Sequence, residues 1–322
     1  MKFRKILAIT IAALLVVFNL TSCGQDSAKK TEDGGKKVKV VTTIFPQYDF
    51  ARNVLKDKGE VKMLLKPGAE SHSFEPTPKD IKDIENADVF IYTGGENDVW
   101  VKKILKSLGK KAPKTIELLD CTDTVEEETV EGMEHEHHHD EHHEGEHEID
   151  EHVWTSPVNA VKIVEKITDT VSEVDKADKA YFEKNSQAYI KKLKDLDKSF
   201  EKVVKEGKRR TILFGDRFPF RYFADRYNLK YYAAFSGCST ETEANASTVK
   251  FLIKKVKDEK IPVVFTIEMS DKKIAGSVAD ATGAKNLTLH SCHNLTKNEL
   301  EKGEDYISMM KKNIDSLKEA LK

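Results

Sequence analysis

Histidine is the residue type in this chain whose spacing could do metal chemistry. Of the 11 histidines in the 322 residues, seven lie in one acidic stretch of 18 residues, 131–148, which we call the histidine cluster. They are His135, His137, His138, His139, His142, His143 and His147. Neutral imidazole is a good ligand for Zn, Cu, Ni and Fe, whereas Mn and Ca sites favour oxygen. Because the cluster lacks apolar periodicity, it predicts a loop that collects metal ions rather than one rigid site.

The cluster also contains two matches to the H-E-x-x-H pattern of zinc proteases, at 135–139 and 143–147. That pattern works only on a stable helix, where both histidines share a face and the glutamate can activate water. Gly132, Gly145 and the lack of an apolar face argue against such a helix. No general base or activated nucleophile is evident elsewhere, so the sequence favours capture of a metal over catalysis.

Two further histidines lie at predicted connections between elements. His72 follows the turn signal Pro67-Gly68, which comes directly after a predicted strand. Ligands of open α/β sheets bind beyond the carboxyl ends of strands, so His72 is a candidate ligand. His152 lies two residues before Trp154, which could exclude water from it.

The elements that must position these side chains alternate between strand and helix. In the first half, strands are predicted at 38–44, 61–65, 88–92 and 115–119, and helices at 46–55, 78–86 and 98–108. In the second half, strands are predicted at 211–215, 230–235, 263–267 and 286–290, and helices at 219–227, 247–257, 271–282 and 303–321. This alternation predicts βαβ units, parallel sheets and an α/β fold.

A long helix is predicted between the two halves, at 178–206. The segment lacks glycine and proline, and its apolar residues recur at helical spacing in a charged background. At about 1.5 Å per residue, such a helix would run over roughly 40 Å, which suits a connection between two lobes. The alternative is a coiled-coil dimerisation helix, for which the apolar seam is short.

The first 23 residues predict an export signal. A positive start is followed by an apolar run up to Phe18, and Leu20-Thr21-Ser22-Cys23 resembles a bacterial lipobox. The run is shorter than the roughly 20 residues that a membrane span needs. We therefore expect a lipoprotein signal peptide at 1–22, lipidation of Cys23 and a flexible tether at 23–37. The alternative is an ordinary signal peptide with a chance cysteine.

Composition limits the remaining classes of partner. The formal net charge is −2 and the signs are interspersed, so the chain lacks the basic field that nucleic acid binding requires. With Cys23 assigned to lipid, Cys121, Cys238 and Cys292 remain. Three cysteines in a protein outside the cytoplasm imply one disulfide and one free thiol, but the sequence does not decide which two cysteines pair.

The features occur in an order that resembles the metal-binding, cluster A-I, family of ABC-transporter solute-binding proteins, in its zinc branch. The lipobox is followed by P-G-x-E-x-H-x-x-E-P-T-P from Pro67, the histidine cluster, D-x-H-x-W-x-x-P from Asp150, and the long helix. The resemblance covers essentially the whole mature chain. It implies an N-terminal lobe at 38–177 and a C-terminal lobe at 208–322, each with a mostly parallel four-stranded sheet. A rigid helix at 178–207 joins them, and the metal lies in the cleft between.

The same resemblance implies that His72 and His152 are metal ligands, but the second lobe departs from the family pattern. Arg217 stands where a histidine or glutamate ligand is usual, and arginine does not ligate metal. His290 falls on the position of the last ligand. The remaining candidates for the metal shell are Asp216, Glu241, Glu243, Glu268 and His293. Cys238 and Cys292 both follow predicted strands, so we expect a disulfide between them, or a thiolate ligand if they are reduced.

The resemblance therefore implies an extracytoplasmic, lipid-anchored monomer that captures Zn²⁺ and delivers it to the permease and ATPase of an ABC importer. We expect no enzymatic activity and no nucleic acid partner. The alternatives are a manganese or iron carrier of the same fold, a secreted zinc hydrolase, and a surface adhesin or zinc buffer without a transporter.

Overall fold

The computed structural model describes residues 36–70, 74–133, 148–239 and 243–322. Residues 37–322 form one compact unit. The predicted signal peptide, Cys23, His72, Glu241 and all seven histidines of the histidine cluster lie outside the described residues. None of the helices in the described ranges combines the length and the apolar character that a membrane crossing needs.

The first sheet has four parallel strands in the order β2-β1-β3-β4. The strands are β1 (Val38–Thr42), β2 (Gly59–Met63), β3 (Val89–Tyr92) and β4 (Lys114–Glu117). The helices of this half are α2 (Phe45–Leu55), α3 (Pro78–Glu85) and α4 (Val99–Leu108). Every residue of β3 is buried, because this inner strand is covered on both faces. The predicted α/β class with parallel strands is confirmed.

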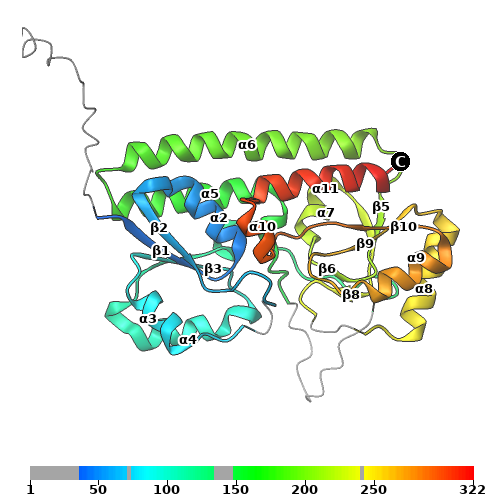
Figure 1. The fold of residues 1–322 in the computed structure, drawn as a ribbon, viewed down its shortest axis with the longest axis horizontal. Coiled ribbons are helices and arrows are strands. Elements are labelled where there is room, and N and C mark those ends of the chain that lie inside the picture. The colour runs from blue at the N-terminus through cyan, green and yellow to red at the C-terminus, as the bar shows by residue number, and fades with distance from the viewer. Residues whose placement is uncertain (1–35, 71–73, 134–147, 240–242) are drawn as a thin grey trace, which may run out of the picture. The chain divides into compact units, whose positions relative to one another are not determined.

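Helices cover both faces of this sheet. Val40 and Ile91 belong to one buried cluster with residues of α2, whereas Val41 and Phe90 belong to another with residues of α3 and α4. Side chains that alternate between faces along a strand therefore serve two separate layers. In Figure 1, α2 lies on one side of the sheet and α3 and α4 on the other.

The second half departs from the predicted four-stranded sheet. Three parallel pairs form instead: β5 (Thr211–Leu213) with β7 (Lys230–Tyr232), β9 (Val263–Thr266) with β10 (Lys285–Thr288), and β6 (Arg217–Phe218) with β8 (Phe235–Ser236). A single bridge between Phe214 and Phe265 connects the first two pairs. The strand predicted at 230–235 is thus two strands. The helices here are α7 (Arg221–Tyr227), α8 (Ala246–Glu259) and α9 (Lys273–Thr282).

Gly215, just after β5, packs closely against α9. A Cβ on Gly215 would lie 2.4 Å from the Cα of Ala275, so only glycine lets the chain pass α9 at the end of β5. The backbone N–H of Gly215 donates to the carbonyl of Phe265 at 3.0 Å, which extends the link between β5 and β9.

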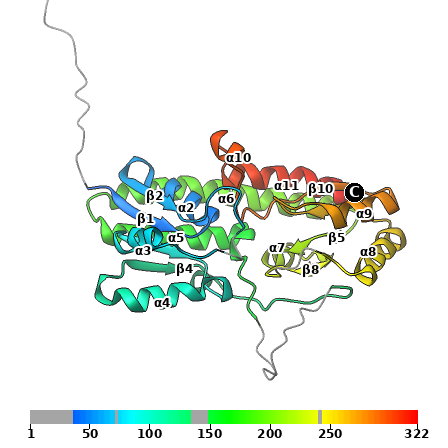
Figure 2. The same cartoon turned by 60° about the horizontal axis from the view of Figure 1, so that its bottom comes forward.

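Long helices pack across both halves. They are α5 (Pro157–Val174), α6 (Lys179–Glu206) and α11 (Tyr306–Ala320), and the short α10 (Lys297–Glu301) precedes α11. The helix predicted at 178–206 is confirmed, and it begins one residue later. It packs against α5 along one part and α11 along another (Figures 1 and 2). Its apolar face, which includes Phe182, Leu193 and Phe200, is buried in the main core.

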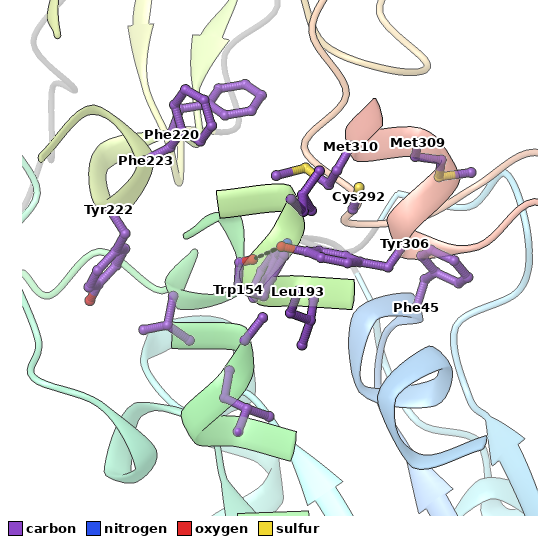
Figure 3. Close-up of a cluster of buried hydrophobic side chains, with 14 of the residues drawn as sticks. Phe45, Trp154, Leu193, Phe220, Tyr222, Phe223, Cys292, Tyr306, Met309 and Met310 are labelled. Atoms are coloured by element: carbon purple, nitrogen blue, oxygen red, sulfur yellow. Dashed lines mark hydrogen bonds between the residues drawn. The ribbon is translucent and has the colours of Figure 1, made fainter. Parts of the chain in front are cut away.

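The core is continuous between the halves around Trp154, whose side chain is 1% exposed. The hydroxyl of Tyr306 donates to the carbonyl of Trp154 at 2.6 Å, as the dashed line in Figure 3 shows. Phe45 and Leu193, which the same view labels, belong to the same buried cluster as this pair. The indole N–H of Trp154 donates to the carbonyl of Ser291 at 2.9 Å, so this residue ties the connection before α5 to the turn after β10.

Candidate metal centre

His152 lies at the start of the short 3-10 turn Val153–Thr155 that leads into α5. It is wholly buried. Its Nδ1 lies 3.1 Å from Oδ1 of Asp150, and the same oxygen accepts the backbone N–H of His152 at 2.8 Å. A carboxylate that holds one ring nitrogen fixes the ring and leaves the other nitrogen to bind a metal. Asp150 is therefore placed as the outer partner of a histidine ligand.

The surroundings of His152 are negative and desolvated. Burial opposes the charged imidazolium, but the carboxylates of Asp150, Glu151 and Glu127 outweigh it and raise the pKa of His152. Burial also raises the pKa of Glu127, although its Oε1 accepts the backbone N–H of Cys238 at 2.9 Å. Such a field attracts cations and, at low dielectric, acts strongly on a divalent ion.

His293 is brought beside His152 by the turn that follows β10. The two ring centroids lie 5.4 Å apart. Trp154 flanks both rings, with its centroid 5.3 Å from that of His152 and 5.0 Å from that of His293. His293 also lines two small clefts, one with Glu268 and the other with Glu151. An imidazole from each half of the chain therefore meets the other at this point.

Glu268, which follows β9, supports the turn that bears His293. Its Oε1 accepts the Ser291 hydroxyl at 2.6 Å and the backbone N–H of His293 at 3.0 Å, while its Oε2 accepts the backbone N–H of Ser291 at 2.7 Å. Three bonds to one carboxylate hold the turn in place. Glu268 is thus engaged with the backbone beside a candidate ligand.

His290 makes a different set of contacts from His293. Its Nδ1 accepts the backbone N–H of Cys292 at 2.9 Å, and its own backbone N–H donates to Oδ1 of Asn313 in α11 at 2.7 Å. Its Nε2 is buried and has no hydrogen-bond partner among the described residues. Of the two histidines, the ring contact to His152 thus belongs to His293, and the unpartnered ring nitrogen belongs to His290.

Two other predicted site residues, Asp216 and Glu243, lie in different surroundings. The carboxylate of Asp216 accepts the backbone N–H of Arg217 at 2.8 Å and that of Ile267 at 3.3 Å, which engages it with two loops. Glu243 is exposed ahead of α8. Among the residues that the structure describes, no group of three or more His, Cys, Asp or Glu side chains is placed to hold a metal.

The cysteines correct one prediction. Cys121, Cys238 and Cys292 are all free thiols in the structure, so the disulfide expected between Cys238 and Cys292 is not formed. Cys292 is fully buried in the core (Figure 3), and burial raises the pKa of its thiol well above the usual range. A high pKa disfavours the thiolate that a zinc ligand requires.

Gly237 is a site residue that the sequence did not indicate. A Cβ there would lie 2.9 Å from the carbonyl oxygen of Phe218 and 3.2 Å from Cε1 of His152. The C-terminal half therefore approaches the His152 ring through bare backbone. A glycine two positions beyond the strand predicted at 230–235 was the only local signal for such a close approach.

An α/β fold of two halves, with an imidazole from each half meeting where they join, defines a two-lobed solute-binding protein. The chain belongs to the family of ZnuA, the periplasmic component A of the zinc-uptake complex, which matches residues 40–320.

Individual relatives carry the likeness over the whole chain. It is 37% identical over 327 residues to the high-affinity zinc uptake system protein ZnuA of Bacillus subtilis strain 168, covering 99% of this chain and 98% of that protein. It is 35% identical over 321 residues to the zinc-binding lipoprotein AdcA of Streptococcus pneumoniae strain R6, where 98% of this chain matches 61% of the longer protein.

Solved structures of this family have a fold similar to that of this chain. The Zn(II)-bound ZnuA-like domain of S. pneumoniae AdcA is 34% identical with a TM-score of 0.73, and the match covers 88% of this chain and 99% of that chain. The metal-dependent lipoprotein YcdH of B. subtilis is 35% identical with a TM-score of 0.74, over 88% and 99% of the two chains.

Proposed function

We propose that this protein captures Zn²⁺ outside the cytoplasm and delivers it to the permease and ATPase of an ABC importer. The observation that carries the proposal is the pair of imidazoles from the two halves, His152 and His293, beside the carboxylate of Asp150. The family supports transport rather than catalysis. Solved relatives that hold zinc support the choice of metal.

We infer that the ligands are His72, His152 and His293, with Glu241 as the candidate for a fourth position in a tetrahedral shell. Glu241 is favoured because the chain just before it, at Gly237, lies against the His152 ring. Asp150 would act as the outer partner that orients the His152 ring, and Glu268 would hold the backbone of the turn that bears His293. His290 would support the turn rather than bind the ion.

Calorimetric titration of the purified protein with Zn²⁺, followed by competition with Mn²⁺, tests this proposal. We expect one tight site that Mn²⁺ at equal concentration does not displace, because imidazole ligands favour zinc. A crystal of the zinc complex should give an anomalous peak at the zinc edge between His152 and His293. Ready exchange for Mn²⁺, or the lack of a tight site, would overturn the assignment.

The histidine cluster is proposed to collect zinc for this site. Replacing residues 134–147 with a Gly-Ser linker of equal length should remove the weaker zinc equivalents from the titration. The tight equivalent should remain, because its proposed ligands lie outside the replaced segment. Equilibrium dialysis with radioactive zinc measures both stoichiometry and affinity; loss of the tight equivalent would contradict separate roles.

Zinc affinity should depend on pH in a direction that the surroundings of His152 set. Zinc binds neutral imidazole, so a protonated ligand must first lose its proton. The raised pKa of His152 makes protons compete at a higher pH than at an ordinary histidine, whose pKa is about 6.5. Lowering the pH from about 8 to about 6 should therefore weaken binding, by up to about tenfold per pH unit for each proton displaced. Calorimetry over this range checks it, and a flat profile would argue against His152 as a ligand.

We also propose that residues 1–22 are removed and that a lipid on Cys23 holds the monomeric protein at the outer face of the membrane. Labelling of producing cells with a palmitate analogue should mark the wild-type protein but not Cys23→Ala. Release of both forms into the medium in equal amounts would contradict the anchor.

A further inference from the structure

We propose that Arg217 is a positioning residue that fastens together two loops beside the zinc site and so slows release of the ion. The inference rests on the proposed function, because it concerns a zinc ion held next to these loops. Arg217 lies in β6, in the C-terminal half, where a metal ligand was expected. Its side chain makes contacts that a histidine or glutamate at this position could not make together.

The guanidinium of Arg217 reaches two loops at once. Nη2 lies 3.2 Å from Oε2 of Glu70, and Nη1 donates to the carbonyl of Ser239 at 3.2 Å. Glu70 precedes the proposed ligand His72 by two residues, and Ser239 precedes Glu241 by two. The planar, always charged fork of arginine can hold two acceptors in fixed directions, which the point charge of lysine does less well.

The connection after β2, which contains Glu70, is held by the C-terminal half at a second point. Nδ2 of Asn294 donates to the carbonyls of Lys66 at 2.8 Å and of Ala69 at 2.9 Å. The backbone N–H of Gly68 donates to the carbonyl of Leu295 at 2.8 Å. Asn294 directly follows His293, so one side of the loop is tied to the turn that bears a proposed ligand. Arg217 ties the same connection at Glu70.

The backbone of Arg217 is itself held firmly. Its N–H donates to Oδ1 of Asp216, whose Oδ2 accepts the N–H of Ile267 after β9. Arg217 also pairs with Phe235 in the β6–β8 ladder. A substitution of the side chain should therefore remove the contacts to Glu70 and Ser239 and leave the local backbone in place.

A clamp and a simple electrostatic effect predict opposite changes in the rate of zinc release when the Arg217 side chain is replaced. As a cation near a divalent ion, Arg217 alone would weaken zinc binding, and its removal would slow release. As a clamp, it slows release, and its removal would speed it. Neutralising Glu70 should speed release under both readings, so Arg217→Gln decides between them.

The experiment measures the zinc dissociation rate of the full protein by chelator competition in stopped flow. We expect Glu70→Gln to speed release about two- to fivefold, as suits a half-exposed ion pair. Arg217→Gln should speed it more, because the contact to Ser239 is lost as well. The effect of the double variant should be smaller than the two single effects combined, since both single variants remove the same contact between Arg217 and Glu70. Arg217→Lys should recover part of the effect.

A matched control is Arg226→Gln, which breaks an arginine–carboxylate pair with Asp197 between α7 and α6 and should leave release unchanged. High salt should speed release of the wild type and have less effect on Glu70→Gln, because Glu70 is 49% exposed. Slower release from Arg217→Gln, or additive effects in the double variant, would overturn the clamp. A wild type without tight zinc would instead refute the proposed function, so the two failures are distinguishable.

Discussion

Replacing His293 with alanine should weaken zinc binding as severely as replacing His152. Both variants should lose more than the roughly 10- to 100-fold that removal of an outer partner of a ligand costs. The reason is geometric, since the two rings lie beside each other, Asp150 holds the His152 ring, and Glu268 holds the backbone N–H of His293 from the other half of the chain. Competition titration with a zinc-specific chelator measures the affinity of each variant.

His290→Ala is the matched control for this prediction. It also removes an imidazole from the same turn, but one whose Nδ1 holds the backbone N–H of Cys292. We expect a smaller loss of zinc affinity, together with some loss of thermal stability, because a buried N–H loses its acceptor. A larger loss of affinity for His290→Ala than for His293→Ala would restore His290 as the ligand and contradict the geometry favoured here.

Replacing Trp154 with alanine should lower the free energy of unfolding by about 3–5 kcal/mol, the usual cost of removing a large buried aromatic side chain. Trp154 lies in the core that both halves share, and its N–H satisfies the carbonyl of Ser291. The loss should also loosen the turn that bears His293. Chemical denaturation of the zinc-free protein measures the first effect, and zinc titration measures the second.

Two variants grade this prediction. Trp154→Phe keeps much of the packing and removes the bond to Ser291, so it should cost less than alanine and still weaken zinc binding. The other tryptophan of the chain, Trp100, lies in α4 and has its indole N–H without a hydrogen-bond partner among the described residues. Trp100→Phe removes no hydrogen bond to the turn that bears His293, so it should weaken zinc binding less than Trp154→Phe does. Equal losses of affinity at the two tryptophans would show that Trp154 acts only through general stability.

The sequence by itself predicted features that depend on local chemistry. A helix was predicted at 78–86, and α3 does begin at Pro78, where the hydroxyl of Thr77 accepts the backbone N–H of Asp80. The absence of glycine and proline, together with the apolar spacing, indicated the long helix α6. Alternation of strands and helices was sufficient to predict the α/β class. Each of these signals is carried by residues within a few positions of one another.

The second half of the site was decided by contacts between distant positions. Whether His290 or His293 faces His152 depends on Glu268, which holds the turn from the previous strand, and on Asn313 in α11. The sequence placed His290 at the end of the strand predicted at 286–290 and His293 just beyond it, and the resemblance assigned the ligand position to His290. The free thiols of Cys238 and Cys292 likewise follow from where their loops pack.

Arg217 shows most clearly what the sequence determines and what only the tertiary structure determines. The family resemblance implied a ligand at this position, where the sequence has an arginine, which does not bind metal. Only the tertiary structure supplied its partners, because Glu70 lies 147 positions earlier in the chain. Local patterns determine which elements form, since propensity and capping act over one or two turns. The direction of a side chain in a turn is determined by whichever distant group satisfies its hydrogen bonds, and that is decided only when the two halves pack together.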